Sequence, residues 1–107
     1  LPLGNLRKLE IARAMALQPK LLLLDECFSG LRHEEIAVIE ELIRDIRATG
    51  VAILLIEHNM RVAMGMSDRI VVLNHGELLA AGTPEEITKN PAVIEAYLGK
   101  GGSGDAA

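Results

Sequence analysis

The sequence predicts an α/β domain built on parallel core strands flanked by helices, and three observations lead to this fold class. Two apolar runs, "LLLL" at 21–24 and "VAILLI" at 51–56, contain no polar residue, as in strands buried on both faces of a parallel sheet. Each run follows a segment of helical character, at 5–17 and 34–48. The order helix, strand, helix, strand is typical of parallel strands joined by right-handed crossovers.

The two helical segments differ in how they are recognised. "NLRKLEIARAMAL" at 5–17 lacks helix breakers and is rich in strong helix formers, with Asn5 placed to cap its start and "QPK" at 18–20 to end it. The second segment, 34–48, is amphipathic, and Gly50 is expected to stop it. Its apolar stripe consists of Ile36, Ile39, Leu42, Ile43 and Ile46.

The last third predicts a β-hairpin and short helices. Asn59 is placed to cap a short helix that reaches about Met66, and 69–82 form two short strands around a turn at 74–76. "TPEE" then predicts a helix with Thr83 as its cap, Pro84 at its first position and Glu86 completing a capping box. Asn90-Pro91 predicts a further helix start. Gly99 is expected to end that helix, and 100–107 form a flexible tail.

Composition restricts the class of protein. Length fits one small domain, and half of the 107 residues are hydrophobic, with one Phe, one Tyr and no Trp, so the core must be aliphatic. A net charge of −4 gives no support for a nucleic-acid partner. Cys27 is the single cysteine, which excludes an internal disulfide and suits a reducing compartment. No run approaches the roughly 20 apolar residues that span a bilayer, and no signal peptide is recognisable. Because the chain does not start with Met, we expect a piece of a longer protein.

Ionisable side chains directly follow both apolar runs. Asp25 and Glu26 end the first, and Glu57 and His58 end the second. If the strands are neighbours, these residues share the edge of the sheet at which ligands bind. An aspartate there can hold Mg²⁺ through water, a glutamate can orient or deprotonate a water, and a histidine can touch a terminal phosphate. The alternative for each is structural: acids at strand ends are often merely solvated, and a lone histidine after a strand is more often structural.

The order and spacing of these segments resemble those of ATP-binding-cassette (ABC) ATPases, a branch of the P-loop NTPases. "LPLGNLRKLEIARAM" resembles the signature segment and its helix, "LLLLDE" the Walker B strand with its catalytic glutamate, "SGLR" the D-loop, and "ILLIEH" the strand leading to the switch histidine. The last segment is similar to the C-terminal part of ATPases that drive branched-chain amino-acid importers. It reads "MSDRIVVLNHGELLAAGTPEEITKNPAVIEAYLG". Lipopolysaccharide-export and urea-import ATPases end similarly.

The resemblance implies roles for individual residues. Glu26 would polarise the attacking water, His58 would contact the γ-phosphate, and Asp25 would help coordinate Mg²⁺. Gly4, with its neighbours Leu3 and Asn5, would present backbone N–H groups to ATP held by a partner subunit. Gly30 and Leu31 would belong to the D-loop. Residues 1–99 then correspond to the C-terminal portion of a nucleotide-binding domain, with 1–82 holding the motifs and hairpin and 83–99 the subfamily segment.

Several features depart from the family's pattern. No G-x-x-x-x-G-K-[ST] phosphate loop occurs anywhere in the chain, so we expect the isolated chain to be inactive. Pro2 stands where the signature serine is expected, Cys27 replaces the proline after Walker B, and Arg32 occupies a D-loop position usually held by Asp or Asn. One hypothesis is therefore an ATPase subunit of an importer. The alternatives are a non-catalytic interaction or assembly module with degenerate nucleotide motifs and, requiring coincidence, an unrelated α/β binding domain.

The resemblance also implies cofactors, partners and location. ATP and Mg²⁺ are the cofactors of the intact parent, and a second ATPase subunit and membrane-spanning transporter subunits are its partners. The protein is expected in the cytoplasm, peripheral on the inner face of the cell membrane. The isolated chain is expected to form a homodimer or larger assembly, because the strands at 21–24 and 51–56 lack the rest of their sheet.

Overall fold

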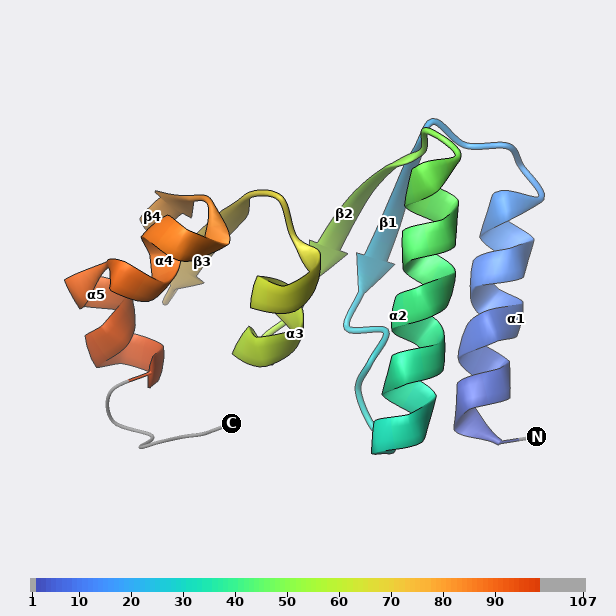
Figure 1. Ribbon diagram of the computed structural model, residues 1–107, viewed down its shortest axis with the longest axis horizontal. Helices are drawn as coiled ribbons and strands as arrows, with labels where there is room; N and C mark the ends of the chain where they lie inside the picture. The colour runs from blue at the N-terminus through green and yellow to red at the C-terminus, as the bar shows by residue number, and fades with distance from the viewer. Residues whose placement is uncertain (1, 99–107) are drawn as a thin grey trace. The chain divides into compact units, whose positions relative to one another are not determined.

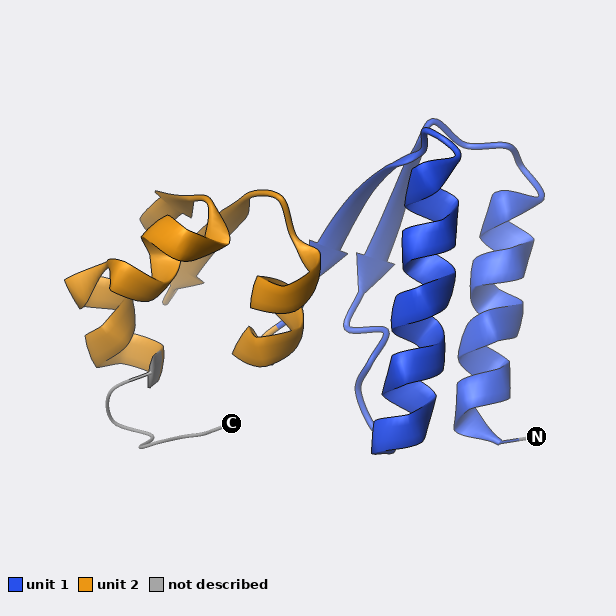
Figure 2. Cartoon of the chain, in the orientation of Figure 1, with its two compact units in different colours: residues 1–57 blue, residues 58–107 orange. Residues whose placement is uncertain are grey.

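The chain forms two compact units. The computed structural model describes residues 2–98, and the division falls between Glu57 and His58, giving units 1–57 and 58–107 (Figure 2). The first unit contains two long helices and two strands, and the second contains a hairpin and shorter helices (Figure 1). Each unit has buried aliphatic side chains of its own.

The first unit is built on two parallel strands, as the order of elements predicted. β1 (Leu21–Asp25) pairs with β2 (Ala52–Ile56) in a parallel register that runs from Leu21 opposite Ala52 to Asp25 opposite Ile56. Because parallel strands end at the same edge, the residues that follow Asp25 and Ile56 leave the sheet side by side. The predicted neighbourhood of the two strands is therefore confirmed.

The prediction that these strands are buried on both faces is wrong for this chain. Burial alternates along β1, with Leu22 and Leu24 buried and Leu21 and Leu23 more than half exposed. β2 alternates in the same way between half-buried and exposed residues. One face of the pair is thus covered, and the other, which we call the outer face, is exposed. The outer face consists of Leu21, Leu23, Ala52, Leu54 and Ile56, with Asp25 at its carboxyl end.

The first helix starts earlier than predicted and is capped differently. α1 (Leu3–Met15) has Pro2 as its N-cap, and the N–H of Leu6 donates to the Pro2 carbonyl at 3.0 Å. Asn5 lies inside the first turn and does not cap the helix. Proline suits the cap position, because the N–H that it lacks has no partner within a helix. The helix ends at Met15, before the left-handed residue Gln18, whose φ is +53°.

The second long helix has the predicted amphipathic stripe. α2 (His33–Ala48) buries Ile39, Ile43 and Ile46. Gly50 follows its C-cap with φ of +100°, a left-handed conformation that glycine adopts at little cost. α1 and α2 lie side by side with their N-termini at the same end (Figure 1). This arrangement brings the start of α1 next to the first turn of α2.

The second unit contains the predicted short helix and hairpin. Asn59 caps α3 (Met60–Met66) by accepting hydrogen bonds from the N–H groups of Arg61 and Val62. β3 (Ile70–Asn74) and β4 (Glu77–Gly82) pair antiparallel around His75 and Gly76, which both have positive φ. Two positive φ angles in a two-residue loop match the turn that joins twisted strands most readily.

The helices after the hairpin start at the predicted caps. Thr83 and Glu86 form the capping box of α4 (Pro84–Lys89), and Asn90 caps α5 (Pro91–Val93). The π-helical segment η1 (Ile94–Leu98) follows directly. Ile70, Val72, Ile87 and Val93 form the core of this unit. The predicted stop at Gly99 and the tail lie outside the described residues.

Across residues 2–98, none of the helices has the length and apolar character required to cross a bilayer.

Candidate functional site

The carboxyl end of β1 places two adjacent carboxylates at the edge of the sheet. Asp25 is the last residue of the strand and is exposed, and Glu26 follows it outside the strand. The N–H of Glu26 donates to the Ile56 carbonyl at 2.8 Å, so the backbone of Glu26 remains tied to β2. Glu57 directly follows Ile56. The structure thus brings Glu26 and the end of β2 to one edge, as the sequence predicted.

Glu26 has an unusual backbone conformation. Its φ is +53°, in the left-handed region that residues with a Cβ seldom adopt. Such a conformation costs on the order of 1–3 kcal/mol and persists only where the surroundings hold it, and Gln18 and His75 adopt it as well. Here it turns the chain sharply out of the strand, and the N–H of Ser29 donates back to the Glu26 carbonyl at 3.2 Å.

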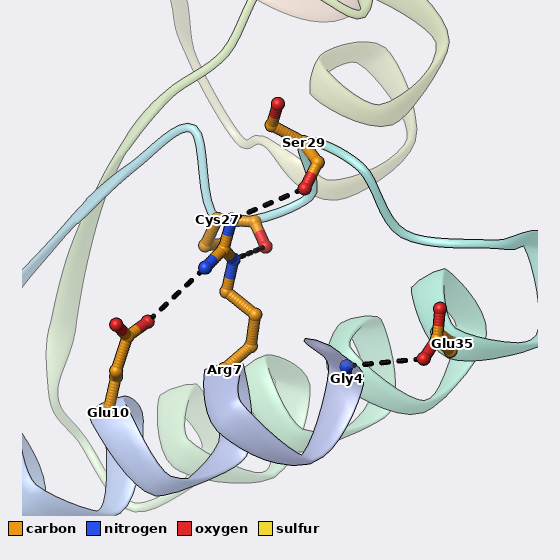
Figure 3. Close-up of polar contacts among 6 residues, drawn as sticks. All are labelled: Gly4, Arg7, Glu10, Cys27, Ser29 and Glu35. Atoms are coloured by element: carbon orange, nitrogen blue, oxygen red, sulfur yellow. Dashed lines mark hydrogen bonds and ion pairs between the residues drawn. The ribbon is translucent and has the colours of Figure 1, made fainter. Parts of the chain in front are cut away.

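An arginine on α1 holds the loop that follows Glu26. Nε of Arg7 donates to the Cys27 carbonyl at 3.0 Å, and Nη2 donates to the Ser29 carbonyl at 3.3 Å (Figure 3). Nη1 lies 3.6 Å from Oε1 of Glu10, one turn along the helix. Arg7 was not predicted from the sequence, because an arginine in a helix has no local feature that distinguishes it from a solvated side chain.

Cys27 lies within this loop and is buried, with 7% of its surface exposed. Burial, and after it the negative charge of Glu57, raise the pKa of its thiol to about 11. The Arg7 guanidinium acts in the opposite direction. A protonated, buried thiol is a weak nucleophile. Cys27, like the buried Phe28 that follows it, therefore acts as a small apolar side chain.

The start of α1 contacts a carboxylate of α2. The N–H of Gly4 donates to Oε2 of Glu35 at 3.2 Å (Figure 3). The N–H of Arg32 donates to Oε1 of the same side chain at 2.9 Å. A Cβ on Gly4 would lie 2.8 Å from Oε2, so a larger residue here would force the Glu35 carboxylate to move. The role of Glu35 was not predicted from the sequence, since Arg32 is not one of the Ser or Thr residues that mark a capping box.

The remaining predicted residues lie around this loop and at the start of α1. Gly30, with φ of +79°, and Leu31 connect the loop to α2, and the N–H of Leu31 donates to the Phe28 carbonyl at 3.2 Å. A Cβ on Gly30 would meet the side chain of Leu3 at 3.0 Å. Leu3 therefore lies beside Gly30, which brings the predicted signature and D-loop segments together. Asn5 is exposed on α1.

Asp25 can contribute to a Mg²⁺ site but cannot form one alone. Residues 2–98 contain no group of three His, Cys, Asp or Glu side chains placed to hold a metal ion. Mg²⁺ usually keeps several waters and is bound through one or two carboxylates together with nucleotide phosphates, so an exposed aspartate at this edge fits the ion when a nucleotide supplies the other ligands. His58 is the first residue of the second unit.

Comparison with known proteins identifies the relatives of this chain. A family model described as "Branched-chain amino acid ATP-binding cassette transporter" matches residues 77–103. The high-affinity branched-chain amino acid transport ATP-binding protein LivG of Salmonella typhimurium is 54% identical over 98 residues, which are 91% of this chain and 38% of LivG. The lipopolysaccharide export ATP-binding protein LptB of Acidithiobacillus ferridurans is 44% identical over 90% of this chain and 40% of LptB.

A solved structure shows the same fold. The ADP conformation of MJ1267, an ATP-binding cassette of an ABC transporter, matches with a TM-score of 0.82 and 27% identity over 94% of this chain and 41% of that chain. This chain thus spans about two fifths of the length of the relatives it matches. It has the fold of the C-terminal part of an ABC ATPase domain, a P-loop NTPase, and in sequence it resembles the ATP-binding subunits of branched-chain amino-acid transporters.

Proposed function

We propose that this chain is part of an ATP-hydrolysing subunit that powers an ABC importer of branched-chain amino acids. The observation that carries the proposal is the conformation of Glu26, a left-handed residue at the carboxyl end of a parallel strand, tied by its N–H to β2. The similarity to LivG over 91% of the chain supports the choice of substrate. The match to LptB, at 44% identity, makes lipopolysaccharide export the competing assignment.

In this proposal Glu26 orients and polarises the water that attacks the γ-phosphate of ATP. A carboxylate accepts a hydrogen bond from the O–H of a water molecule, and this hydrogen bond strengthens as the water becomes a nucleophile. His58 contacts the γ-phosphate, and Asp25 holds Mg²⁺ through water. Bound Mg²⁺ supplies charge neutralisation at the phosphates. The signature segment faces ATP held by the second ATPase subunit and consists of Leu3, Gly4 and Asn5. The D-loop residues Gly30 and Leu31 face the same subunit.

The partners and location follow from the same proposal. A second ATP-binding subunit and membrane-spanning transporter subunits complete the importer, which places the protein in the cytoplasm on the inner face of the cell membrane. The isolated chain contains no G-x-x-x-x-G-K-[ST] segment. Because that segment supplies most β- and γ-phosphate contacts in P-loop NTPases, the chain alone neither hydrolyses ATP nor binds it more tightly than about millimolar, which corresponds to roughly 4 kcal/mol.

A second candidate is a non-catalytic interaction or assembly module. Two observations favour it. Pro2 lacks the hydroxyl and backbone donor of the signature serine, and the Gly4 N–H already donates to Glu35. A serine substitution separates the candidates: in a subunit that contains this chain, Pro2→Ser raises hydrolysis if the signature is weakened but active, and leaves it unchanged if the module is non-catalytic.

Glu26→Gln tests the proposal in a full ATP-binding subunit that contains this chain. The amide keeps the size of the side chain but cannot accept a proton or carry the charge, so kcat falls to background while MgATP binding stays within about twofold. The matched control is Glu34→Gln, which makes the same change at an exposed position of α2. Undiminished hydrolysis in Glu26→Gln would show that Glu26 is only a solvated strand end.

A further inference from the structure

One side chain connects the start of α1 to the loop that follows Glu26. All three guanidinium nitrogens of Arg7 are engaged: two donate to the carbonyls of Cys27 and Ser29, and the third lies near Glu10 (Figure 3). The Arg7 side chain is only 21% exposed. A planar fork with fixed donor directions can hold two carbonyls at once, which a single ammonium group cannot do with the same geometry.

The loop between Glu26 and Leu31 lies between β1 and α2 and belongs to neither. Two of its turns are closed by hydrogen bonds, from the Ser29 N–H to the Glu26 carbonyl and from the Leu31 N–H to the Phe28 carbonyl, both at 3.2 Å. Glu26 and Gly30 at its two ends have positive φ. A short segment with a strained residue keeps one conformation only where its surroundings hold it, and Arg7 supplies two such contacts from a neighbouring helix.

We propose that Arg7 is a positioning residue, which fixes the loop that follows Glu26 and thereby fixes the direction of the Glu26 carboxylate. This inference rests on the proposed role of Glu26 in ATP hydrolysis. Arg7 lies one turn beyond Gly4 on α1, so the side chain also links the segment proposed to face ATP of the partner subunit to the segment proposed to hold the attacking water. A displacement of about 1 Å at such a site can lower the rate about 100-fold.

The contact can be tested in this chain by amide hydrogen exchange. In Arg7→Gln we expect faster exchange at the amides of Ser29 and Leu31, with unchanged exchange at the paired amides of β1 and β2. Lys8→Gln removes the same charge from the next, exposed residue of α1 and leaves all of these amides unchanged. Arg7→Lys keeps the charge without the fork and gives an intermediate loop rate. Unchanged loop amides in Arg7→Gln would overturn the proposal.

Kinetics of a full subunit containing this chain test the consequence. We expect Arg7→Gln to lower kcat about 10- to 100-fold with KM for MgATP within about twofold, Arg7→Lys to recover part of the rate, and Lys8→Gln to match the unsubstituted subunit. Loosened loop amides with normal kcat would show that Arg7 only stabilises the fold. If the unsubstituted subunit hydrolyses no ATP, the proposed function fails and the positioning of Glu26 for catalysis fails with it. The exchange result still reports whether Arg7 holds the loop.

Discussion

The backbone N–H of Gly4 donates a hydrogen bond to Oε2 of Glu35, a residue 31 positions later in the chain. The same carboxylate accepts the N–H of Arg32 through Oε1. One side chain therefore accepts hydrogen bonds from N–H groups at the starts of two adjacent helices, α1 and α2, where such groups have no acceptor within their own helix. The helix dipoles favour a negative charge at this position, and the Gly4 N–H that is proposed to face ATP already has an internal acceptor.

This contact predicts a pH dependence of stability. The hydrogen bond from the Arg32 N–H, followed by that from the Gly4 N–H, lowers the pKa of Glu35 below its ordinary value of 4.5. A lowered folded-state pKa contributes stability above pH 4.5 that is lost as the pH falls through the folded value. We expect Glu35→Gln to flatten the acid limb of the free energy of unfolding measured in urea between pH 6 and pH 3.

The control for this experiment is Glu41→Gln, an exposed position on the same helix, which should keep the slope of the unsubstituted chain. Part of the slope remains in Glu35→Gln, because the N–H of Thr83 lowers the pKa of Glu86 in the same pH range. An acid limb of equal slope in Glu35→Gln would contradict the assignment.

Gln18 predicts a stabilising substitution. Its φ is +53° just beyond the C-terminal end of α1, where its N–H donates to the Met15 carbonyl at 2.9 Å. The left-handed conformation costs a residue with a Cβ about 1–2 kcal/mol, and glycine avoids this cost but loses more chain entropy on folding. We expect Gln18→Gly to raise the free energy of unfolding by about 0.5–1 kcal/mol. Gln18→Ala keeps the Cβ and should give no gain; equal stabilisation by alanine would rule out the backbone explanation.

The Cys27 thiol should react slowly while the chain is folded. With a pKa of about 11 instead of 9.0, its thiolate fraction at pH 8 is about 100-fold smaller than in the unfolded chain, and burial lowers access further. Iodoacetamide labelling followed by mass spectrometry, with and without urea, measures this ratio. Because the folded-state pKa is raised, stability falls as the pH rises from 9 to 11, and Cys27→Ala should remove that fall. Equal labelling rates in both states would disprove the prediction.

The outer face of the β1–β2 pair predicts self-association of the isolated chain. Leu23 and Leu54 lie opposite each other and are 57% and 53% exposed. Burying a few hundred Å² of apolar surface at ~25 cal/mol per Å² favours pairing by several kcal/mol before the cost of association. We expect a dimer or larger assembly by light scattering at ~100 μM, far above the micromolar range. Leu23→Lys should shift it toward monomer, whereas Leu17→Lys, at a site that is 83% exposed and off this face, should not. A clean monomer without substitution would refute it.

Local features were determined by the sequence itself. The caps at Asn59, Thr83 and Asn90 and the left-handed stop at Gly50 form as predicted, because each depends on hydrogen bonds or φ angles within a few residues. The parallel pairing of β1 and β2 also follows from the order of elements. The positions of Asp25 and Glu26 at the strand end follow from the change from apolar to acidic residues.

The tertiary structure decided which faces are buried and what surrounds Glu26. A run of leucines fits a strand buried on one face as well as it fits a strand buried on both. Only the packing shows that Leu21 and Leu23 are exposed. The contacts of Arg7 with Cys27 and Ser29 and of Glu35 with Gly4 join residues 20 to 31 positions apart. Hydrogen bonds over such separations depend on how α1 and α2 pack, and no local pattern of residues encodes them.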